Sequence, residues 1–339
     1  MFFCFLSLFF CFCGFLLFFP AIFVQEMVLH AFIVYVFFCL SPAAVQSADP
    51  AAAGKDSLLV VFWNLENYFS PAGRMHWTKS RFIRKRNAVA KTIFSIADSE
   101  GRMPDVIGVA EVENAFVLES LVSGTPLRKV RYGIVHYDSP DPRGIDVALI
   151  YRKDVLKLVD SAPVEVCGTD GHPLRTRDIL KVRFLRRDGD TLAVLVNHHP
   201  SKYGNGSGRK REAAMATLSR ITRELLESGT VNIIAMGDFN DTPASTDEYS
   251  SMMVNLALPL AGRGEGTIKY EGKWELIDMF FVSPELERMC GPLSMKIARI
   301  PFLSVKDNVH SGEKPLRSFT GPRYSGGVSD HRPIVLVIQ

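Results

Sequence analysis

An acidic residue and an amide follow an apolar run in the second half of the chain. The run is Val231–Met236, and Asp238 and Asn240 come shortly after it. These largely apolar residues have the length and β-branched content of a buried strand. Side chains two residues apart share one face of an extended backbone. The pair therefore offers an acceptor and a donor at a sheet edge, although an Asp- and Asn-rich turn is the common structural alternative.

Polar residues of the same kind recur beside other apolar runs, either directly after a run or at its beginning. If the strands of the second group run opposite to those of the first, all of these side chains meet at one edge of the sheets. Turn chemistry does not explain so many polar residues at the ends of buried strands. Asn64, Glu111, His198 and Asp238 follow a run, while Asp146, Asp278, Asp330 and His331 begin one.

The spacing of apolar residues predicts the elements that would position these side chains. A helix is expected from Ser80, as its N-cap, to about Ala97. A second helix is expected from about Arg209 to Glu227, and Gly229 would end it. The basic residues in the first turns of the helix that begins at Ser80 are interpreted as a solvent-exposed face. The predicted strands are Leu58–Trp63, Val106–Ala110, Ile145–Tyr151, Leu180–Leu185, Leu192–Val196, Val231–Met236, Leu276–Val282 and Ile334–Ile338.

The N-terminal residues differ in composition from the rest of the 339-residue chain. Phe2–Val24 carries no charge, and a second apolar run, Met27–Leu40, precedes a stretch of small residues like those at cleavage sites. We expect residues 1–48 to be a cleaved signal peptide, 49–56 a linker, and 57–339 an exported domain, periplasmic or secreted. A start at Met27 would explain the missing basic residues, and an uncleaved membrane anchor is the rival interpretation.

Cysteine usage and net charge narrow the classes of function. Outside the leader only Cys167 and Cys290 remain, which would either pair or stay as buried thiols. No cysteine and histidine spacing matches a zinc site. The net charge of +3 permits a polyanionic substrate without requiring one.

Carboxylates and carboxamides without thiolates suit a hard cation such as Mg²⁺. His198 and His331 supply groups that titrate near neutrality, and Asn and Arg donors can hold phosphate oxygens. The chain has no Walker loop, no G-x-S-x-G and no H-E-x-x-H motif, which argues against NTP-driven transfer, serine hydrolysis and zinc proteolysis. The chemistry that remains is metal-assisted attack of water on a phosphate ester.

Six motifs occur in the order seen in the endonuclease/exonuclease/phosphatase superfamily. They are W-N-L-E-N, A-E-V-E-N, N-H-H-P-S-K, G-D-F-N, L-I-D-M-F-F-V and S-D-H. From about Ser57 to Gln339 the chain resembles this group, which includes DNase I, the exonuclease III-like repair nucleases, and inositol and sphingolipid phosphoesterases. The resemblance implies an α/β fold, a four-layer α/β/β/α sandwich of two mixed sheets flanked by helices.

The resemblance also implies a metal site and a position for the attacking water. Glu111 would be the main metal ligand, with Asn64 and Asp330 beside it. The metal would be Mg²⁺, with Mn²⁺ or Ca²⁺ as alternatives. Asp238 would orient or deprotonate the water, and Asn240 would hold the phosphate.

Two histidines and an arginine complete the implied site. His331, oriented by Asp278, would contact the scissile phosphate. His198 would be the second catalytic histidine, with Asp146 as its carboxylate partner. His199 is adjacent, and some relatives place the histidine there, so the choice between the two stays open with His198 preferred. Arg177 resembles a phosphate-contacting arginine, and Ala110 stands where many relatives have Gln.

Three functional hypotheses follow. The first is an exported metal-dependent phosphodiesterase, a nuclease that hydrolyses DNA or RNA. The second is a hydrolase of small phosphoesters, such as inositol phosphates or sphingomyelin, that uses the same residues. The third is an inactive binding module, which the complete set of polar residues disfavours. We expect a monomer, attached to a membrane only if the leader is retained, whose specificity lies in the loops Phe69–Lys79, Pro200–Gly208 and Pro301–Gly327.

Overall fold

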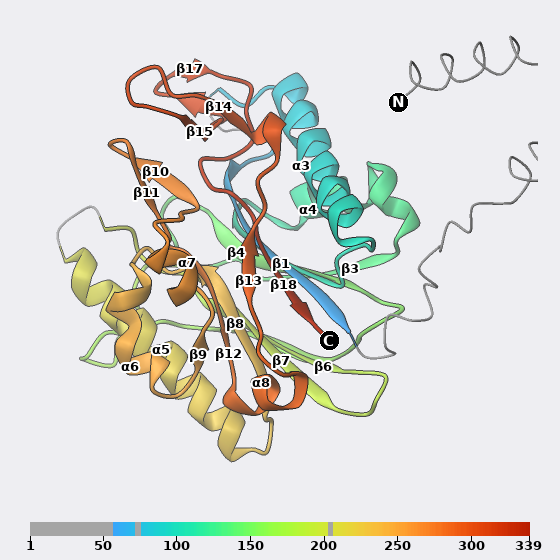
Figure 1. Ribbon diagram of the computed structural model, residues 1–339, viewed down its shortest axis with the longest axis vertical. Coiled ribbons are helices and arrows are strands. Elements are labelled where there is room, and N and C mark those ends of the chain that lie inside the picture. The colour runs from blue at the N-terminus through green and yellow to red at the C-terminus, as the bar shows by residue number, and fades with distance from the viewer. Residues whose placement is uncertain (1–56, 72–75, 203–205) are drawn as a thin grey trace, which may run out of the picture. The chain divides into compact units, whose positions relative to one another are not determined.

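The computed structural model describes residues 57–71, 76–202 and 206–339 (Figure 1). The expected leader and linker lie outside these described residues. The described part belongs to one compact unit that extends to Gln339. Within it, no helix combines the length and the apolar composition that a bilayer span requires.

The first large sheet has the order β13-β18-β1-β2-β4-β3 among the described residues. β1 and β2 run parallel, whereas β18 and β4 run antiparallel to them. The apolar runs explain the central strands, since both faces of β1 and β2 are buried. The strands are β1 (Leu58–Tyr68), β2 (Val106–Val112), β3 (Tyr132–His136), β4 (Asp146–Arg152), β13 (Met295–Ile297) and β18 (Ile334–Ile338).

The second large sheet has the order β5-β6-β7-β8-β12-β9. Its parallel pair is β7 and β8, and β6 and β12 run antiparallel on either side of that pair. The strands are β5 (Lys157–Val164), β6 (Ile179–Leu185), β7 (Thr191–His198), β8 (Asn232–Asp238), β9 (Val254–Asn255) and β12 (Asp278–Val282).

The two large sheets pack face to face, with helices on both outer sides (Figure 1). Phe62 of β1 and Val194 of β7 share one apolar core. In β2, a Cβ on Gly108 would lie 2.5 Å from the Cε of Met236, so glycine permits the close approach of the sheets. The predicted four-layer α/β/β/α sandwich is therefore confirmed.

The helices lie where the apolar spacing places them. α3 packs its buried face, which includes Val89 and Ile93, on the first sheet. α5 packs Leu218 and Ile221 into the core of the second sheet. The cap of α3 is Thr78, whose side chain accepts from the amide of Arg81, and not the expected Ser80. In the described part of the chain the α-helices are α3 (Lys79–Glu100), α4 (Ala115–Ser123), α5 (Ser207–Glu227), α6 (Asp247–Ser250), α7 (Leu258–Gly262) and α8 (Pro284–Cys290).

Three short hairpins extend from the sandwich at the upper left of Figure 1. Two of them belong to the segment Pro301–Gly327, for which the sequence predicted only a loop. Strands of two or three residues are too short to show a periodic pattern. The hairpins are β10 (Ile268–Tyr270) with β11 (Lys273–Glu275), β14 (Ser304–Lys306) with β15 (Glu313–Pro315), and β16 (Phe319–Thr320) with β17 (Arg323–Tyr324).

Candidate active site

The polar strand ends of both sheets meet at one edge. The parallel pairs end there, and the antiparallel strands β4, β12 and β18 begin there, as their registers require. In the second sheet, His198, Asp238 and Asp278 are direct neighbours across β7, β8 and β12. The Nδ2 of Asn64 donates to the Oδ2 of Asp238 at 3.0 Å and so links the two sheets. The opposed strand directions thus bring Asn64, His198, Asp238 and Asp278 to one edge.

His331 and Asp278 form a buried pair. The Nδ1 of His331 lies 2.8 Å from the Oδ2 of Asp278, as the resemblance implied. Burial alone would lower the pKa of His331, but the carboxylates of Asp278, Asp238 and Asp330 outweigh it and hold that pKa well above its ordinary value. The ring is therefore a cation, whose Nε2 faces the Oδ2 of Asp238 at 3.8 Å.

Asp238 is held by donors on both of its oxygens. Besides the amide of Asn64, it accepts the backbone N–H of Asn240 at 2.9 Å. Burial raises the pKa of Asp238 to about 7, against the opposing charge of His331. Asn240 has a φ of 51°, a left-handed conformation that asparagine tolerates. Its Nδ2 donates to the carbonyl of His199 at 2.9 Å, so its expected phosphate contact stays a prediction.

Glu111 is positioned by a break in β2. Its φ is 61°, and the pairing of β2 with β4 shifts register between Ala110 and Val112. Such a bulge re-aims one side chain. The Oε2 of Glu111 accepts the N–H of Asn67 at 2.8 Å, and its Oε1 accepts from the guanidinium of Arg143 at 3.0 Å. The carboxylate is thus fixed at the site edge.

His198 faces this cluster and His199 does not. The Nε2 of His198 lies 3.7 Å from the Oδ2 of Asp238 and 3.9 Å from the Oε1 of Glu111. Burial and the charge of Arg177 hold the pKa of His198 well below its ordinary value, so the ring is neutral. His199 packs edge-on against Phe239, with ring centroids 4.9 Å apart. The structure thereby favours His198 for contact with substrate.

The expected pairing of His198 with Asp146 is wrong. The Oδ2 of Asp146 lies 3.1 Å from the Nε2 of His136, and its Oδ1 accepts from the backbone and the hydroxyl of Ser139. The antiparallel pairing of β3 with β4 brings His136 beside Asp146. The Nδ1 of His198 is buried without a hydrogen-bond partner among the described residues.

Arg177 does not present its guanidinium to a phosphate. The side chain is buried and donates to the carbonyls of His198, at 3.1 Å, and of His199. It also donates to Asp141 at 2.9 Å. With these acceptors Arg177 fixes the end of β7, so its implied role as a phosphate contact is corrected to a positioning role.

Asp330 belongs to a charged network that the sequence did not reveal. The guanidinium of Arg317 lies 2.9 Å from the Oδ2 of Asp330 and donates to Glu66 at 2.8 Å. Burial raises the pKa of Glu66 to about 7, and the nearby charge of Asp330 adds to that effect. Arg317 comes from the segment predicted as a specificity loop, where a lone arginine carries no distinguishing signal.

Lys85 lies beneath this network. It is buried, and its Nζ donates to the carbonyl of Glu66 at 2.5 Å and to the hydroxyl of Ser318 at 2.8 Å. Burial lowers the pKa of Lys85 to about 8. The expectation that the basic run of α3 forms a solvated face is therefore wrong for this residue.

The donors at the edge fit a hard divalent cation. Glu111 and Asp330 offer carboxylate oxygens and Asn64 offers an amide oxygen, which are the ligand types that Mg²⁺ and Mn²⁺ prefer. Asp238, Asp278 and His331 also place one ligand atom each within 4.8 Å of one another. However, the Nδ1 of His331 is bound to the Oδ2 of Asp278 at 2.8 Å, and its raised pKa keeps the ring protonated, so the ring has no nitrogen lone pair for a metal. Asn64, Glu111 and Asp330 therefore remain the candidate ligands, as the resemblance implied. The Oδ1 of Asn64 and both oxygens of Glu111 accept hydrogen bonds in the structure, but each of these oxygens retains a second lone pair.

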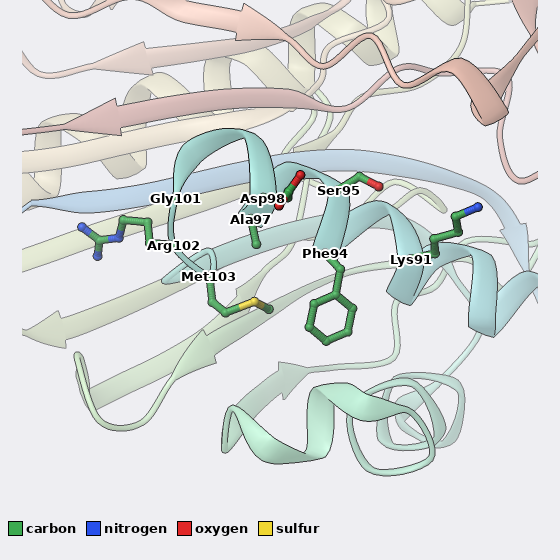
Figure 2. Close-up of a pocket in the computed structure, with 8 residues that line it drawn as sticks. All are labelled: Lys91, Phe94, Ser95, Ala97, Asp98, Gly101, Arg102 and Met103. Carbon is green, nitrogen blue, oxygen red and sulfur yellow. The ribbon is translucent and has the colours of Figure 1, made fainter. Parts of the chain in front are cut away.

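A separate depression of about 580 Å³ lies at the end of α3 (Figure 2). It is lined by the last turns of that helix and by the residues Gly101–Met103 that follow it. These residues lead into the beginning of β2, whereas Glu111 lies near its end. The depression is therefore at the opposite edge of the sheet and has no part in the candidate site.

Comparisons with known proteins agree with this geometry. A family model described as "Endonuclease/Exonuclease/phosphatase family" matches residues 64–339. A search of curated proteins gave no match. Similar solved structures include the human Nocturnin catalytic domain, with 16% identity and a TM-score of 0.54 over 84% of this chain and 93% of that one.

Two further structures have the same fold. Truncated TDP2 from Caenorhabditis elegans has 15% identity and a TM-score of 0.55, over 83% of this chain and 97% of that one. The mannosyl-6-phosphatase of Bacteroides thetaiotaomicron has 15% identity and a TM-score of 0.55, over 83% and 100%. The family match and the converging site residues place this chain in the endonuclease/exonuclease/phosphatase family, whose members are phosphoester hydrolases.

Proposed function

We propose that this protein is an exported, metal-dependent phosphodiesterase that hydrolyses phosphodiester bonds of DNA or RNA. The observation that carries the proposal is the cluster of Asp238, His331 and Asp278 at the shared edge of the two sheets. It places a proton acceptor and a buried cationic donor within 3.8 Å of each other. Attack of water on a phosphate ester needs both groups on one phosphorus centre.

The side chains divide the work as follows. Asp238 orients the water and accepts its proton, and a carboxyl with a pKa of about 7 is well matched to that task. His331 donates from Nε2 to a phosphate oxygen, while Asp278 keeps the imidazole protonated and aligned. His198 offers a neutral ring on the side of Glu111. A divalent ion held by Glu111, Asp330 and Asn64 would supply positive charge that stabilises the developing charge on phosphate.

A nucleic acid is the first candidate substrate because basic side chains surround the site. Arg143 and Arg317 are each about half exposed, with 50% and 53% of their side-chain surfaces accessible. Lys202 is also exposed, and its Nζ forms an ion pair with the Oε2 of Glu275 in β11 at 2.8 Å. Basic groups around a phosphate site favour a polyanionic backbone.

A small phosphoester is the second candidate. It is favoured by the likeness of the whole domain to a structure named as a mannosyl-6-phosphatase. Both substrates require the same reacting groups, so the surrounding loops decide between them. We further propose that the domain works as a monomer outside the cytoplasm, and that it is tethered to a membrane only if the leader is retained.

Substrate assays separate the two candidates. Purified protein with Mg²⁺ or Mn²⁺ is incubated with plasmid DNA, RNA, sphingomyelin, inositol phosphates and mannose 6-phosphate. We expect nucleic acid to be cleaved fastest and Asp238→Asn to abolish the cleavage. Preferential release of phosphate from a small ester would replace the nuclease assignment with the phosphatase one. No hydrolysis of any substrate would leave the inactive module as the better description.

A further inference from the structure

We propose that Arg143 and Arg317 bind the substrate phosphate, and that the divalent cation releases them for this task. In the structure each arginine pairs with one carboxylate of the candidate metal site, Glu111 or Asp330. The guanidinium groups would be repelled by a cation held on those carboxylates and would then be free to bind phosphate oxygens. The inference rests on the proposed metal-dependent hydrolysis and adds an order of binding, with the cation first and the phosphate second.

Arg143 is fixed at its backbone, while its guanidinium lies at the surface. Its backbone N–H donates to Asp141 at 2.9 Å, and Asp141 is itself held by the buried Arg177. The guanidinium reaches the Oε1 of Glu111 at 3.0 Å. Half of the side chain is exposed. A pinned backbone with an exposed charged end can move between two acceptors without refolding the loop.

Arg317, on another loop, also combines a hydrogen-bonded backbone with an exposed guanidinium. The carbonyl of Arg317 accepts from Gly327, and the next residue, Ser318, donates its N–H to Glu66 at 2.9 Å. The guanidinium spans the Oε1 of Glu66 and the Oδ2 of Asp330. It too is about half exposed. Two independent loops therefore bring an arginine to the two acidic ligands.

Arg177 differs from these two arginines because its guanidinium is buried and hydrogen-bonded within the protein. Its three nitrogens donate to the carbonyls of His198 and His199 and to Asp141, and its side chain is 7% exposed. The guanidinium groups of Arg143 and Arg317 are instead about half exposed, although the carboxylates with which they pair are largely buried. Each guanidinium can therefore leave its carboxylate for a phosphate oxygen without being moved out of a buried position.

Electrostatic interactions favour the transfer of the two guanidinium groups from the carboxylates to a phosphate. A divalent cation brings two positive charges to carboxylates that now attract guanidinium groups. A phosphate brings negative charge to the same place, and the planar fork of arginine binds phosphate through two hydrogen bonds. Binding of the cation and of the anion should thus be positively coupled, and the coupling is reciprocal.

The test measures binding and not turnover. Arg143→Gln and Arg317→Gln are compared with wild type and with Arg220→Gln. Arg220 is the matched control, because it is 52% exposed, pairs with Glu224 at 2.7 Å and lies on α5 away from the site. Mn²⁺ is titrated calorimetrically into each protein, and sulfate, as the anion probe, is then titrated into the Mn²⁺-loaded proteins. Circular dichroism checks that each variant is folded.

We expect the two effects to have opposite signs. Loss of a competing guanidinium should raise Mn²⁺ affinity about two- to fivefold, while loss of a charge-assisted hydrogen bond should weaken sulfate binding roughly tenfold. Arg220→Gln should change neither. If the site variants bind Mn²⁺ more weakly, or bind sulfate as wild type does, the two arginines only support the fold and the inference is overturned.

Glu111→Gln distinguishes this failure from failure of the proposed function. If wild type binds Mn²⁺ and Glu111→Gln loses that binding, the metal site stands, and the arginine variants alone decide the inference. If wild type binds no Mn²⁺ at all, the metal-dependent function and the inference both fall.

Discussion

His198 and His331 each bring Nε2 within 4 Å of the Oδ2 of Asp238 at the edge of the sandwich, and their environments give the two rings different charges. His331 is held as a cation by three carboxylates, whereas His198 is kept neutral by burial and by neighbouring arginines. Residues of one type thus acquire different tasks from their surroundings. Substitutions at this scale should separate chemistry from folding.

His331→Ala should lower kcat by roughly 10²-fold or more, because a preorganised donor is lost. It should also cost about 3 kcal/mol of stability, because Asp278 is left as an unpaired buried charge. Adding Asp278→Asn should recover much of the stability but none of the activity. Urea melts and steady-state kinetics on wild type, the single variant and the double variant check this. Recovery of activity by the double variant would show that His331 acts only in folding.

His199 should make stability depend on pH. Burial lowers its pKa to about 3 in the folded protein, with Arg177 adding to the effect, against 6.5 as the ordinary value. The unfolded chain therefore binds the proton more readily, so stability is present above pH 6.5 and falls as the pH drops below it. Between pH 7.5 and pH 5 wild type should lose about 2 kcal/mol more than His199→Leu. Urea melts of the two proteins across this pH range measure the free energy of unfolding. If it depends on pH in the same way in both proteins, the interpretation is refuted.

At the scale of secondary-structure elements, the candidate site residues lie at strand ends, which contacts with neighbouring elements hold in place. β7 ends at His198, and the guanidinium of Arg177 ties the carbonyls of His198 and His199 to Asp141 in the loop before β4. Glu111 depends in the same way on the bulge in β2. The position of each of these side chains is therefore set by a neighbouring element and not only by its own strand.

Arg177→Met should destabilise the protein by about 3–5 kcal/mol, because the buried carboxylate of Asp141 would lose its ion-pair partner at 2.9 Å and keep only the more distant guanidinium of Arg143, at 3.9 Å. A residue that only contacts substrate would instead raise KM and leave stability unchanged. Chemical denaturation and kinetics on the variant separate these outcomes. Arg175→Met offers the control, since Arg175 is exposed and lies two residues away. Equal stability of the two variants would restore the substrate-contact role.

At the scale of the whole molecule, two sheets contribute to one site and leave their polar ends at a common edge. The site therefore requires both sheets of the domain. Because its candidate metal ligands are oxygen atoms, we expect hydrolysis to depend on a hard divalent cation.

Activity should be abolished by EDTA and restored by Mg²⁺ or Mn²⁺, while a zinc-selective chelator should have no effect. The reason is that Glu111, Asp330 and Asn64 offer oxygen ligands and no thiolate. Hydrolysis measured with each chelator, and again after metal is added back, checks this. Full activity in EDTA would contradict the metal-dependent mechanism.

The leader should be removed on export. Small residues cluster directly after the second apolar run, so the mature protein should begin between about Ala44 and Ala53. N-terminal sequencing of exported protein gives the answer. A chain that begins at Met1 or Met27 would identify a retained anchor.

The sequence alone determined the central strands and the polar groups at their ends, because a fully buried strand must be apolar and its polar end is then conspicuous. Thus the apolar runs at Leu58 and Val106, and the groups Asp238, Asp278 and His331, are recognisable from residue type and order alone. The two long helices were also predictable from their 3.6-residue spacing.

Only the tertiary structure decided which groups touch. Asp146 pairs with His136 because β3 lies beside β4, and no local pattern specifies that register. Lys85 is buried because the segment around Ser318 folds over α3, which a helical charge run does not reveal. Arg143 and Arg317 reach Glu111 and Asp330 through loops whose paths no local pattern specifies. Burial leaves a periodic imprint on sequence, whereas contacts between distant segments depend on how the chain closes.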